Sequence, residues 1–169
     1  TDKSRKCLGG YLYNKVSKEV YTIQATHTVL ATGGASKLYQ FTTNPNTSTG
    51  DGIAVAWRAG CTISNMEFIQ FHPTCLYHRS DKSFLISESL RGEGAQLLTK
   101  DGERFMHRYD PREELAPRDV VARAIDNEMK ERDLRHVYLD ISMKDKKFVQ
   151  NRFPAIYEKC LELGIDITK

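Results

Sequence analysis

The fold is decided first by one short stretch, Thr28-Val29-Leu30-Ala31-Thr32-Gly33-Gly34. Residues 28–31 lack polar alternation, which predicts a short strand buried on both faces. The paired glycines after it let the backbone approach a bound group with no Cβ in the way. The stretch therefore predicts the floor of a nucleotide-cofactor site, although paired glycines after a strand are also common in plain turns. The GxGxxG phosphate-binding fingerprint is absent from the chain.

Strand and helix signals lie on both sides of this stretch. Two β-rich runs, 11–16 and 19–25, predict a hairpin because Ser17-Lys18 between them suits a turn. A helix is expected to begin near Ser48-Thr49-Gly50-Asp51 and to end at Gly60. Asp51 is placed either to cap that helix or to accept hydrogen bonds from a ribose or ribityl chain.

The character of the sequence changes near Met66. Residues 66–98 predict short strands and loops, and Asp101-Gly102 predicts a turn. The strongest helix prediction is 117–132, which carries one apolar stripe at helical spacing. The stripe consists of Val120, Val121, Ala124, Ile125 and Met129.

The last part of the chain predicts a strand at 137–141, a turn capped by Asp145, and a helix from Pro154 to Gly164. That helix is expected to bury Phe153, Ile156, Tyr157, Cys160 and Leu161. The predicted fold class is α+β, with two domains at 1–65 and 66–169.

Composition excludes several classes of protein. The chain has 169 residues, 40% of them hydrophobic and 28% charged, and a net charge of +3, which is ordinary for a globular protein. No basic cluster with interleaved aromatics is present, and no apolar run approaches the length of a membrane span. We therefore expect no nucleic-acid partner, no membrane partner and a cytoplasmic location. We also expect an internal fragment of a longer protein, because the chain starts without methionine and stops just after a helix terminator.

The cysteines indicate neither a disulfide framework nor a metal site. Cys7, Cys61, Cys75 and Cys160 form no CxxC pair, and their spacing is unlike that of zinc ligands. Cys61 and Cys75 stand in apolar surroundings and are expected to be buried.

Arg118 is the first candidate for chemistry. It follows Pro117 in the first turn of the predicted helix, where the helix dipole disfavours a cation. Such a cation is either exposed and without function or held in place for an anion. Glu88 and Arg91, three residues apart, could pass protons or hold charge beside it; the alternative is a surface ion pair.

His72 is the second candidate. Pro73 biases it towards an extended conformation, from which it could donate to a carboxylate in a cleft. The alternative is a core histidine with its hydrogen bonds satisfied. The other histidines show no ligand spacing: His27, His78, His107 and His136.

A series of ordered motifs resembles the succinate dehydrogenase/fumarate reductase flavoprotein family, and within it most closely the branch that oxidises L-aspartate. The motifs cover nearly the whole chain: 29–34, 43–45, 48–52, 66–77, 90–95 and 114–126. Pro117 before Arg118, and Cys75-Leu76-Tyr77, resemble the aspartate branch.

The resemblance implies a role for each candidate residue. Residues 1–65 would be a late piece of a Rossmann-like FAD-binding domain, and 66–169 a capping domain that closes over substrate. Arg118 would be the active-site acid, with Glu88 and Arg91 in its proton relay. The substrate carboxylates would be held by His72, Gln70 and Ser87, where the family usually has threonine at position 87. FAD, bound non-covalently, would contact Thr32, Gly33, Gly34 and Asp51.

The activity implied is oxidation of L-aspartate to iminoaspartate for NAD biosynthesis, with hydride transfer to FAD and reoxidation by oxygen or fumarate. Two alternatives remain open: a fumarate reductase or succinate dehydrogenase flavoprotein subunit, and a non-catalytic binding module. The family's phosphate-binding motif and a further substrate histidine and arginine are not found in this chain. We therefore expect that the 169 residues alone bind FAD weakly or not at all and are inactive.

Overall fold

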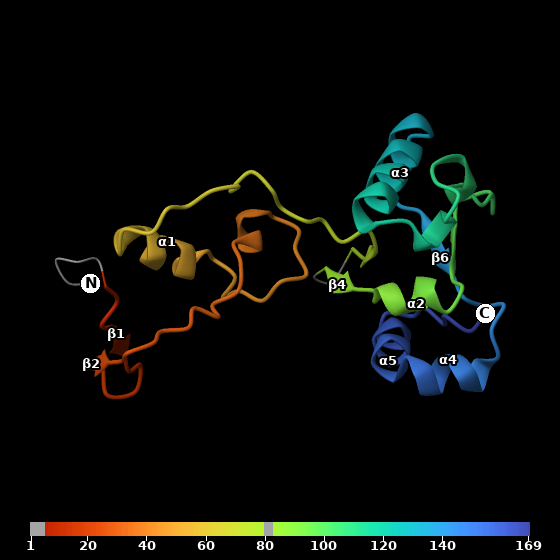
Figure 1. Cartoon of the computed structure of the whole chain (residues 1–169). Coiled ribbons are helices and arrows are strands. Elements are labelled where there is room, and N and C mark those ends of the chain that lie inside the picture. The colour runs from red at the N-terminus through yellow and green to blue at the C-terminus, as the bar shows by residue number, and fades with distance from the viewer. Residues whose placement is uncertain (1–5, 80–82) are drawn as a thin grey trace. The chain divides into compact units, whose positions relative to one another are not determined.

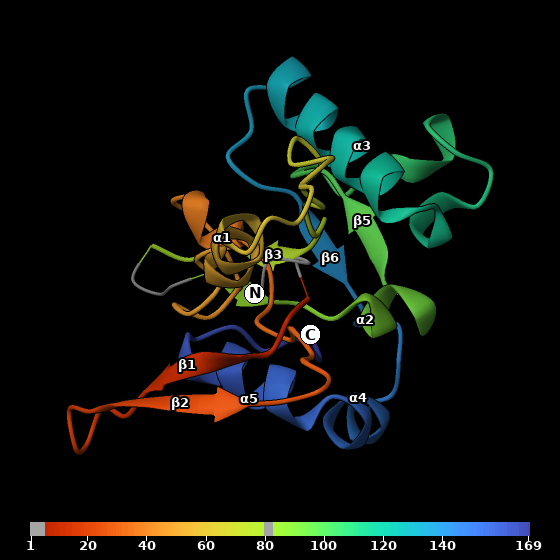
Figure 2. The same ribbon diagram turned by 60° about the vertical axis from the view of Figure 1, so that its left-hand side comes forward.

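The computed structural model describes residues 6–79 and 83–169. The chain divides into two compact units, an N-terminal unit that ends at Ile69 and a C-terminal unit from Gln70 to Lys169. Both helices and strands occur, as expected for an α+β fold, and the described strands form three separate two-stranded sheets (Figures 1 and 2). Among the described residues, no helix combines the length and apolar character needed to cross a bilayer.

The N-terminal unit begins with the predicted hairpin. Strand β1 (Gly9–Tyr13) pairs with β2 (Val20–Gln24) in antiparallel register, with Tyr11 opposite Thr22. The turn is closed by Asn14, whose side chain accepts from the backbone N–H groups of Val16 and Ser17. The hairpin prediction is confirmed: β1 begins two residues earlier than expected, and β2 lies within the predicted range.

The predicted buried strand at 28–31 is wrong. These residues form no regular strand, and Val29 and Leu30 are 87% and 53% exposed. A β-strand needs a partner for its ladder of hydrogen bonds. Strands β1 and β2 pair with each other, and no other described segment pairs with 28–31. The apolar run is therefore present without the sheet that would bury it.

Helix α1 (Asp51–Arg58) follows a short 3₁₀ helix, Ser36–Leu38. Its N-cap, at a φ of +81°, is Gly50, which is one of the four residues predicted to start the helix. Glycine is favoured here because an L side chain at this φ is strained. No side chain caps the helix, so Asp51, the first helical residue, does not serve as its cap. The helix ends before Gly60 (φ +92°), as predicted.

The C-terminal unit contains two short antiparallel strand pairs. Strand β3 (Cys75–Leu76) pairs with β4 (Phe84–Leu85), and β5 (Gln96–Leu98) pairs with β6 (Tyr138–Asp140), both antiparallel. The expected turn at 101–102 is present, with Gly102 at φ +79°. Helix α2 (Glu88–Gly92) lies in the segment predicted as strands and loops. A helix of five residues is too short for periodicity to indicate it.

The longer helices follow the sequence patterns. They are α3 (Arg118–Glu131), α4 (Lys146–Arg152) and α5 (Pro154–Glu162). Asp145 caps α4 as predicted, because its side-chain oxygen Oδ1 accepts hydrogen bonds from the backbone N–H groups of Lys147 and Phe148. One detail of α5 is wrong: Leu161 is 43% exposed, because it lies off the face that carries Ile156 and Cys160.

Two hydrophobic clusters hold the C-terminal unit together. Helix α3 lies on one side of the β5–β6 pair, whereas α4 and α5 lie on the other (Figures 1 and 2). Leu139 of β6 packs against both clusters. The first comprises Ile86, Leu90, Ala95, Ile141, Val149, Phe153, Ile156 and Cys160. The second comprises Leu97, Phe105, Met106, Ala116, Val121, Ala124 and Ile125, which confirms the apolar stripe of α3.

The cysteines differ from expectation. Cys61 and Cys75 are exposed, whereas Cys160 is buried in the first cluster. Cys61 follows the end of α1, in a unit where no described hydrophobic side chain is buried, so its apolar neighbours do not enclose it.

This contrast between the units predicts different protection from hydrogen exchange. In the 169-residue protein we expect amides of α1 to exchange at least about 100-fold faster than those of α3, because local opening costs least where little apolar surface is buried. Trp57 on α1 is 67% exposed, whereas Val121 and Ala124 on α3 are fully buried. Exchange measured by mass spectrometry on peptides covering the two helices tests this. Equal protection would show that the N-terminal unit has a core of its own.

Candidate active site

One arginine of the C-terminal unit contacts two other segments. Arg118 is the first residue of α3, and Pro117 before it has an extended ψ of 147°. Nε of Arg118 donates to Oε2 of Glu88 at 2.7 Å, and Nη2 lies 2.6 Å from the same oxygen. Nη1 donates to Oε1 of Gln70 at 3.2 Å. The carboxylate of Glu88 therefore offsets the unfavourable field that a cation meets at a helix N-terminus.

Glu88 is presented by the first turn of α2. Its neighbour Ser87 is the N-cap, because Ser87 Oγ accepts from the backbone N–H of Ser89 at 3.2 Å and donates to Ser89 Oγ at 3.1 Å. The hydrogen bond from Arg118 lowers the pKa of Glu88 and outweighs the effect of desolvation. The side chains of Arg118 and Glu88 are 42% and 46% exposed, so solvent screens the pair and a ligand can reach it.

Arg91 lies one turn further along α2 and is buried. Its Nη2 is 3.9 Å from Oε1 of Glu88, and its Nη1 donates to the backbone carbonyl of Glu114 at 2.6 Å. Burial lowers the pKa of Arg91, the charge of Glu88 opposes that change, and the charge of Arg118 lowers the pKa further. Two guanidinium groups thus share one carboxylate, an arrangement that suits charge binding or proton passage.

His72 is half-buried beside these charges. Its Nδ1 lies 3.1 Å from the carbonyl oxygen of Thr74 and 3.3 Å from the nitrogen of the same residue. Burial lowers the pKa of His72, the backbone bond to Thr74 opposes this, and the charges of Arg118 and Arg91 lower it further, so the ring is neutral at pH 7. Within the described residues no group hydrogen-bonds to Nε2 of His72, which leaves that nitrogen for a ligand.

The structure therefore brings five of the six predicted active-site residues into one charged cluster. Gln70 and Glu88 bind Arg118 directly, Arg91 pairs with Glu88, and His72 lies within their field. Ser87 adjoins the cluster in sequence, but its hydroxyl caps α2. We call this set the arginine cluster (Gln70, His72, Glu88, Arg91, Arg118).

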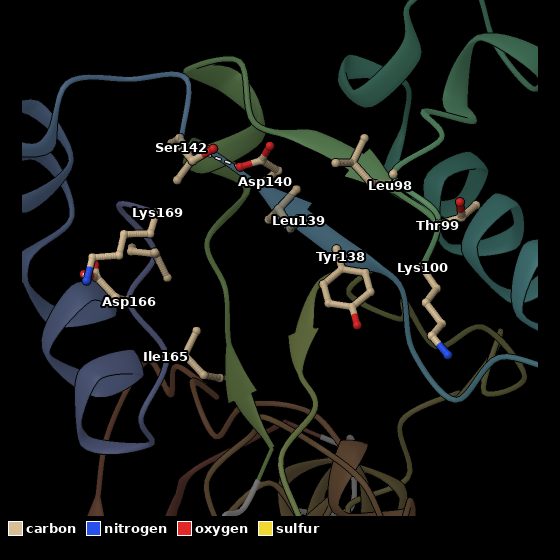
Figure 3. A pocket seen from close by; sticks show the side chains of 13 residues that line it. Leu98, Thr99, Lys100, Tyr138, Leu139, Asp140, Ser142, Ile165, Asp166 and Lys169 are labelled. Carbon is tan, nitrogen blue, oxygen red and sulfur yellow. Dashed lines mark hydrogen bonds and ion pairs between the residues drawn. The ribbon is translucent and has the colours of Figure 1, made fainter.

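A cavity of about 380 Å³ in the same unit lies elsewhere. It is bordered by β5, β6 and residues 165–169, with Lys100, Asp140, Asp166 and Lys169 as its charged groups (Figure 3). No member of the arginine cluster lines it. A catalytic site is recognised by interacting titratable groups with shifted pKa values, and these are found in the arginine cluster. The cluster therefore remains the candidate site.

One contributor to the cluster was not predicted. Glu114, in the 3₁₀ helix Glu113–Leu115 (η3), holds Arg91 through its backbone carbonyl. A backbone acceptor leaves no signature in a sequence pattern, since every residue has one. The one available signal was the acidic pair Glu113-Glu114 shortly before Arg118.

The predicted cofactor residues lie in the N-terminal unit, where the loop after 28–31 meets the start of α1. The carbonyl of Gly34 accepts from the backbone N–H of Gly50 at 3.1 Å. A Cβ placed on Gly52 would lie 1.8 Å from Oγ1 of Thr32, so the two segments are in close contact. Asp51 lies between Gly50 and Gly52 in the sequence, and its side chain is exposed. Closely packed backbone at a helix N-terminus, with a carboxylate beside it, fits the phosphate and ribose parts of a dinucleotide.

The profile of a protein family described as "FAD binding domain" matches residues 1–169, the whole chain. The chain belongs to this family. The contact between the 32–34 loop and α1 lies within the matched region.

Relatives of the chain include L-aspartate oxidases, which confirms the resemblance inferred from the motifs. The chain is 61% identical over 166 residues to an L-aspartate oxidase of Pseudomonas aeruginosa, covering 98% of this chain and 31% of that protein. It is 63% identical over 164 residues to L-aspartate oxidase 1 of Ralstonia nicotianae, again covering 31% of that protein and 97% of this chain. The chain thus spans about a third of the length of the curated relatives it matches.

Solved structures agree with this placement. A quinol-fumarate reductase with menaquinol molecules matches with a TM-score of 0.77 and 32% identity, covering 89% of this chain and 29% of that one. An E. coli quinol fumarate reductase matches with a TM-score of 0.76 and 33% identity, covering 88% of this chain and 28% of that one. The chain therefore shares its fold with segments of fumarate reductases.

Proposed function

We propose that this chain is part of an FAD-dependent oxidase that converts L-aspartate to iminoaspartate in NAD biosynthesis. The observation that carries the proposal is the arginine cluster, where Arg118 binds both Glu88 and Gln70 from segments far apart in the chain. The identity of over 60% to L-aspartate oxidases supports the choice of substrate.

The proposal includes a domain assignment. Residues 1–65 would be a late piece of a Rossmann-like FAD-binding domain, and residues 66–169 a capping domain that covers the substrate. The division of the chain after Ile69 supports this boundary, since few contacts cross a domain border. The capping unit would carry every side chain of the arginine cluster.

FAD, when bound, supplies the two-electron acceptor for the hydride. Thr32, Gly33, Gly34 and Asp51 would hold it non-covalently, and the remaining contacts would come from other parts of the full-length enzyme. The isolated 169-residue chain would bind it weakly or not at all.

The side chains of the capping unit would orient the substrate and move protons. Neutral His72 and Gln70, with the hydroxyl of Ser87, would bind the two carboxylates of L-aspartate, and the charge of Arg118 would complement them.

In the oxidation of L-aspartate, a hydride would leave the α-carbon and the amino nitrogen would lose a proton, which gives iminoaspartate. When fumarate serves as the oxidant, it gains a hydride at one alkene carbon and a proton from Arg118 at the other, which gives succinate. Glu88 and Arg91 would then return a proton to Arg118.

Two alternative functions are less well supported than the oxidase. A fumarate reductase or succinate dehydrogenase flavoprotein subunit is favoured by the solved structures, but at 32–33% identity, well below that to the oxidases. A non-catalytic binding module is opposed by the identity of over 60% to proteins named L-aspartate oxidase. A cytoplasmic enzyme of a small dicarboxylate, with neither nucleic acid nor membrane as partner, fits the oxidase proposal best.

The test uses a full-length L-aspartate oxidase that contains this segment, called here the host enzyme. Under nitrogen, L-aspartate should bleach the flavin absorbance of the host enzyme within seconds, whereas succinate should leave it unchanged. Bleaching by succinate and not by L-aspartate would favour the succinate dehydrogenase reading. A folded host enzyme whose flavin responds to neither compound would favour the binding module.

A further inference from the structure

Arg91 has a single hydrogen bond to fix its guanidinium group. Its Nη1 donates to the carbonyl oxygen of Glu114, whereas its buried Nε and Nη2 atoms have no hydrogen-bond partner within the described residues. The contact with Glu88 is an ion pair at 3.9 Å, too long for a hydrogen bond. The position of one backbone carbonyl therefore decides where this buried cation points.

That carbonyl is in turn fixed by the side chain of its own residue. The carboxylate of Glu114 is 4% exposed and accepts from the backbone N–H of Leu97 at 3.0 Å. It also accepts from Nε and Nη2 of Arg104 at 3.1 and 2.5 Å. Burial raises the pKa of Glu114, but the hydrogen bonds from Arg104 and Leu97 outweigh burial and lower it, so the group is ionised at neutral pH. Strand β5 and Arg104 thus hold η3 at its second residue.

We propose that Glu114 is a positioning residue for the proton relay, whose buried carboxylate holds its own backbone carbonyl where it directs Arg91 towards Glu88. The inference rests on the proposed function, since the relay has a purpose only if Arg118 exchanges protons with a substrate. The order of contacts is Leu97 and Arg104 to Glu114, then Arg91, Glu88 and Arg118.

Loss of this anchor has a defined electrostatic consequence. The titratable groups that face Glu88 are Arg118 from α3, Arg91 from its own helix and His72 from the segment before β3. The positive charges of Arg118 and Arg91 lower the pKa of Glu88, as does His72 when its ring is protonated. If Arg91 moves away, one of these positive charges is lost and the pKa of Glu88 rises. The acidic limb of the pH profile of kcat/KM for fumarate, which reports groups of the enzyme before fumarate binds, should therefore move to higher pH.

The test compares matched variants of the host enzyme. With L-aspartate as the electron donor, Glu114→Gln should lower kcat/KM for fumarate about 10- to 100-fold, as expected when a catalytic group is misplaced by about an ångström, and should move the acidic limb to higher pH. Glu128→Gln is the control for stability, since Glu128 is another carboxylate, 2% exposed, that pairs with Arg108 and Arg132 but has no bond to the arginine cluster. It should lower the melting temperature to a similar extent and leave the acidic limb in place.

Two further variants separate the effect on Arg91 from a general loss of stability. Glu113→Gln removes the other carboxylate that binds Arg104 and should leave the profile unchanged, because Glu113 does not bind Arg91. Arg104→Gln changes a residue that is 35% exposed and should shift the acidic limb in the same direction as Glu114→Gln, even if the latter fails to fold. A folded Glu114→Gln or Arg104→Gln variant with an unshifted limb would overturn the inference. If the unchanged host enzyme does not oxidise L-aspartate, the proposed function itself fails.

Discussion

Replacing Arg118 by lysine in the host enzyme should lower kcat for L-aspartate oxidation with fumarate as the oxidant about 10²- to 10⁴-fold, the range expected when a positioned proton-transfer group is lost. The guanidinium group of Arg118 donates in two directions at once, from Nε and Nη2 to Glu88 and from Nη1 to Gln70. A lysine ammonium is a single point of charge and cannot reproduce this planar fork. The Lys variant should therefore keep its fold and its FAD but lose turnover.

The matched control for this prediction is Arg123→Lys. Arg123 is on the same helix and pairs with Asp119 four residues earlier, but its side chain is 72% exposed and takes no part in the arginine cluster. This variant should retain wild-type kcat and KM, since exposed ion pairs contribute little. The test is to measure steady-state kinetics and flavin content for both variants, so that loss of turnover can be told from loss of FAD. Near-normal turnover of Arg118→Lys would remove Arg118 from the chemistry and favour a binding module.

Replacing Gly52 by alanine should weaken FAD binding by the host enzyme about 10- to 100-fold, because inserting a methyl group into a packed contact typically costs ~1–3 kcal/mol. The new Cβ would lie 1.8 Å from Oγ1 and 2.9 Å from Cβ of Thr32, so the 32–34 loop must move away from α1. Alanine favours a helix over glycine by about 1 kcal/mol, which is not enough to offset such a clash. The loss should be visible as a lower ratio of flavin to protein absorbance.

Two variants show whether the clash is the cause. Gly10→Ala, in β1, adds the same methyl group where no atom lies within 4 Å and should keep full flavin content. In the double variant Gly52→Ala with Thr32→Ala, the nearest clashing atom is removed and part of the flavin should return. Full flavin content in Gly52→Ala alone would show that the contact between the loop and α1 is not needed for the cofactor.

Local patterns predicted most of the helices of the C-terminal unit. The stripe on α3, the Asp145 cap of α4 and the glycine that ends α5 are all set within a few residues, so they can be recognised before any packing is known. The short helix α2 was not predicted, because a helix of five residues is too short to show a periodic apolar pattern.

Patterns failed where a segment depends on distant partners. Residues 28–31 have the composition of a buried strand, yet they are exposed because no described strand lies beside them. Cys61 and Cys75 have apolar neighbours in sequence but are exposed in space. Burial is a property of what packs against a residue, which its immediate neighbours in sequence do not determine.

The family, the candidate side chains and the helix that begins at Arg118 can be read from the sequence, since these follow from residue types at short, fixed spacings. How those side chains meet depends on the folded chain. Arg118 reaches Glu88 across 30 positions and Gln70 across 48, and Arg91 depends on the carbonyl of Glu114, 23 positions away. Such contacts arise when the β5–β6 pair and its helices pack together, because hydrogen bonds act over about 3 Å and so depend on the folded path of the chain rather than on distance along it.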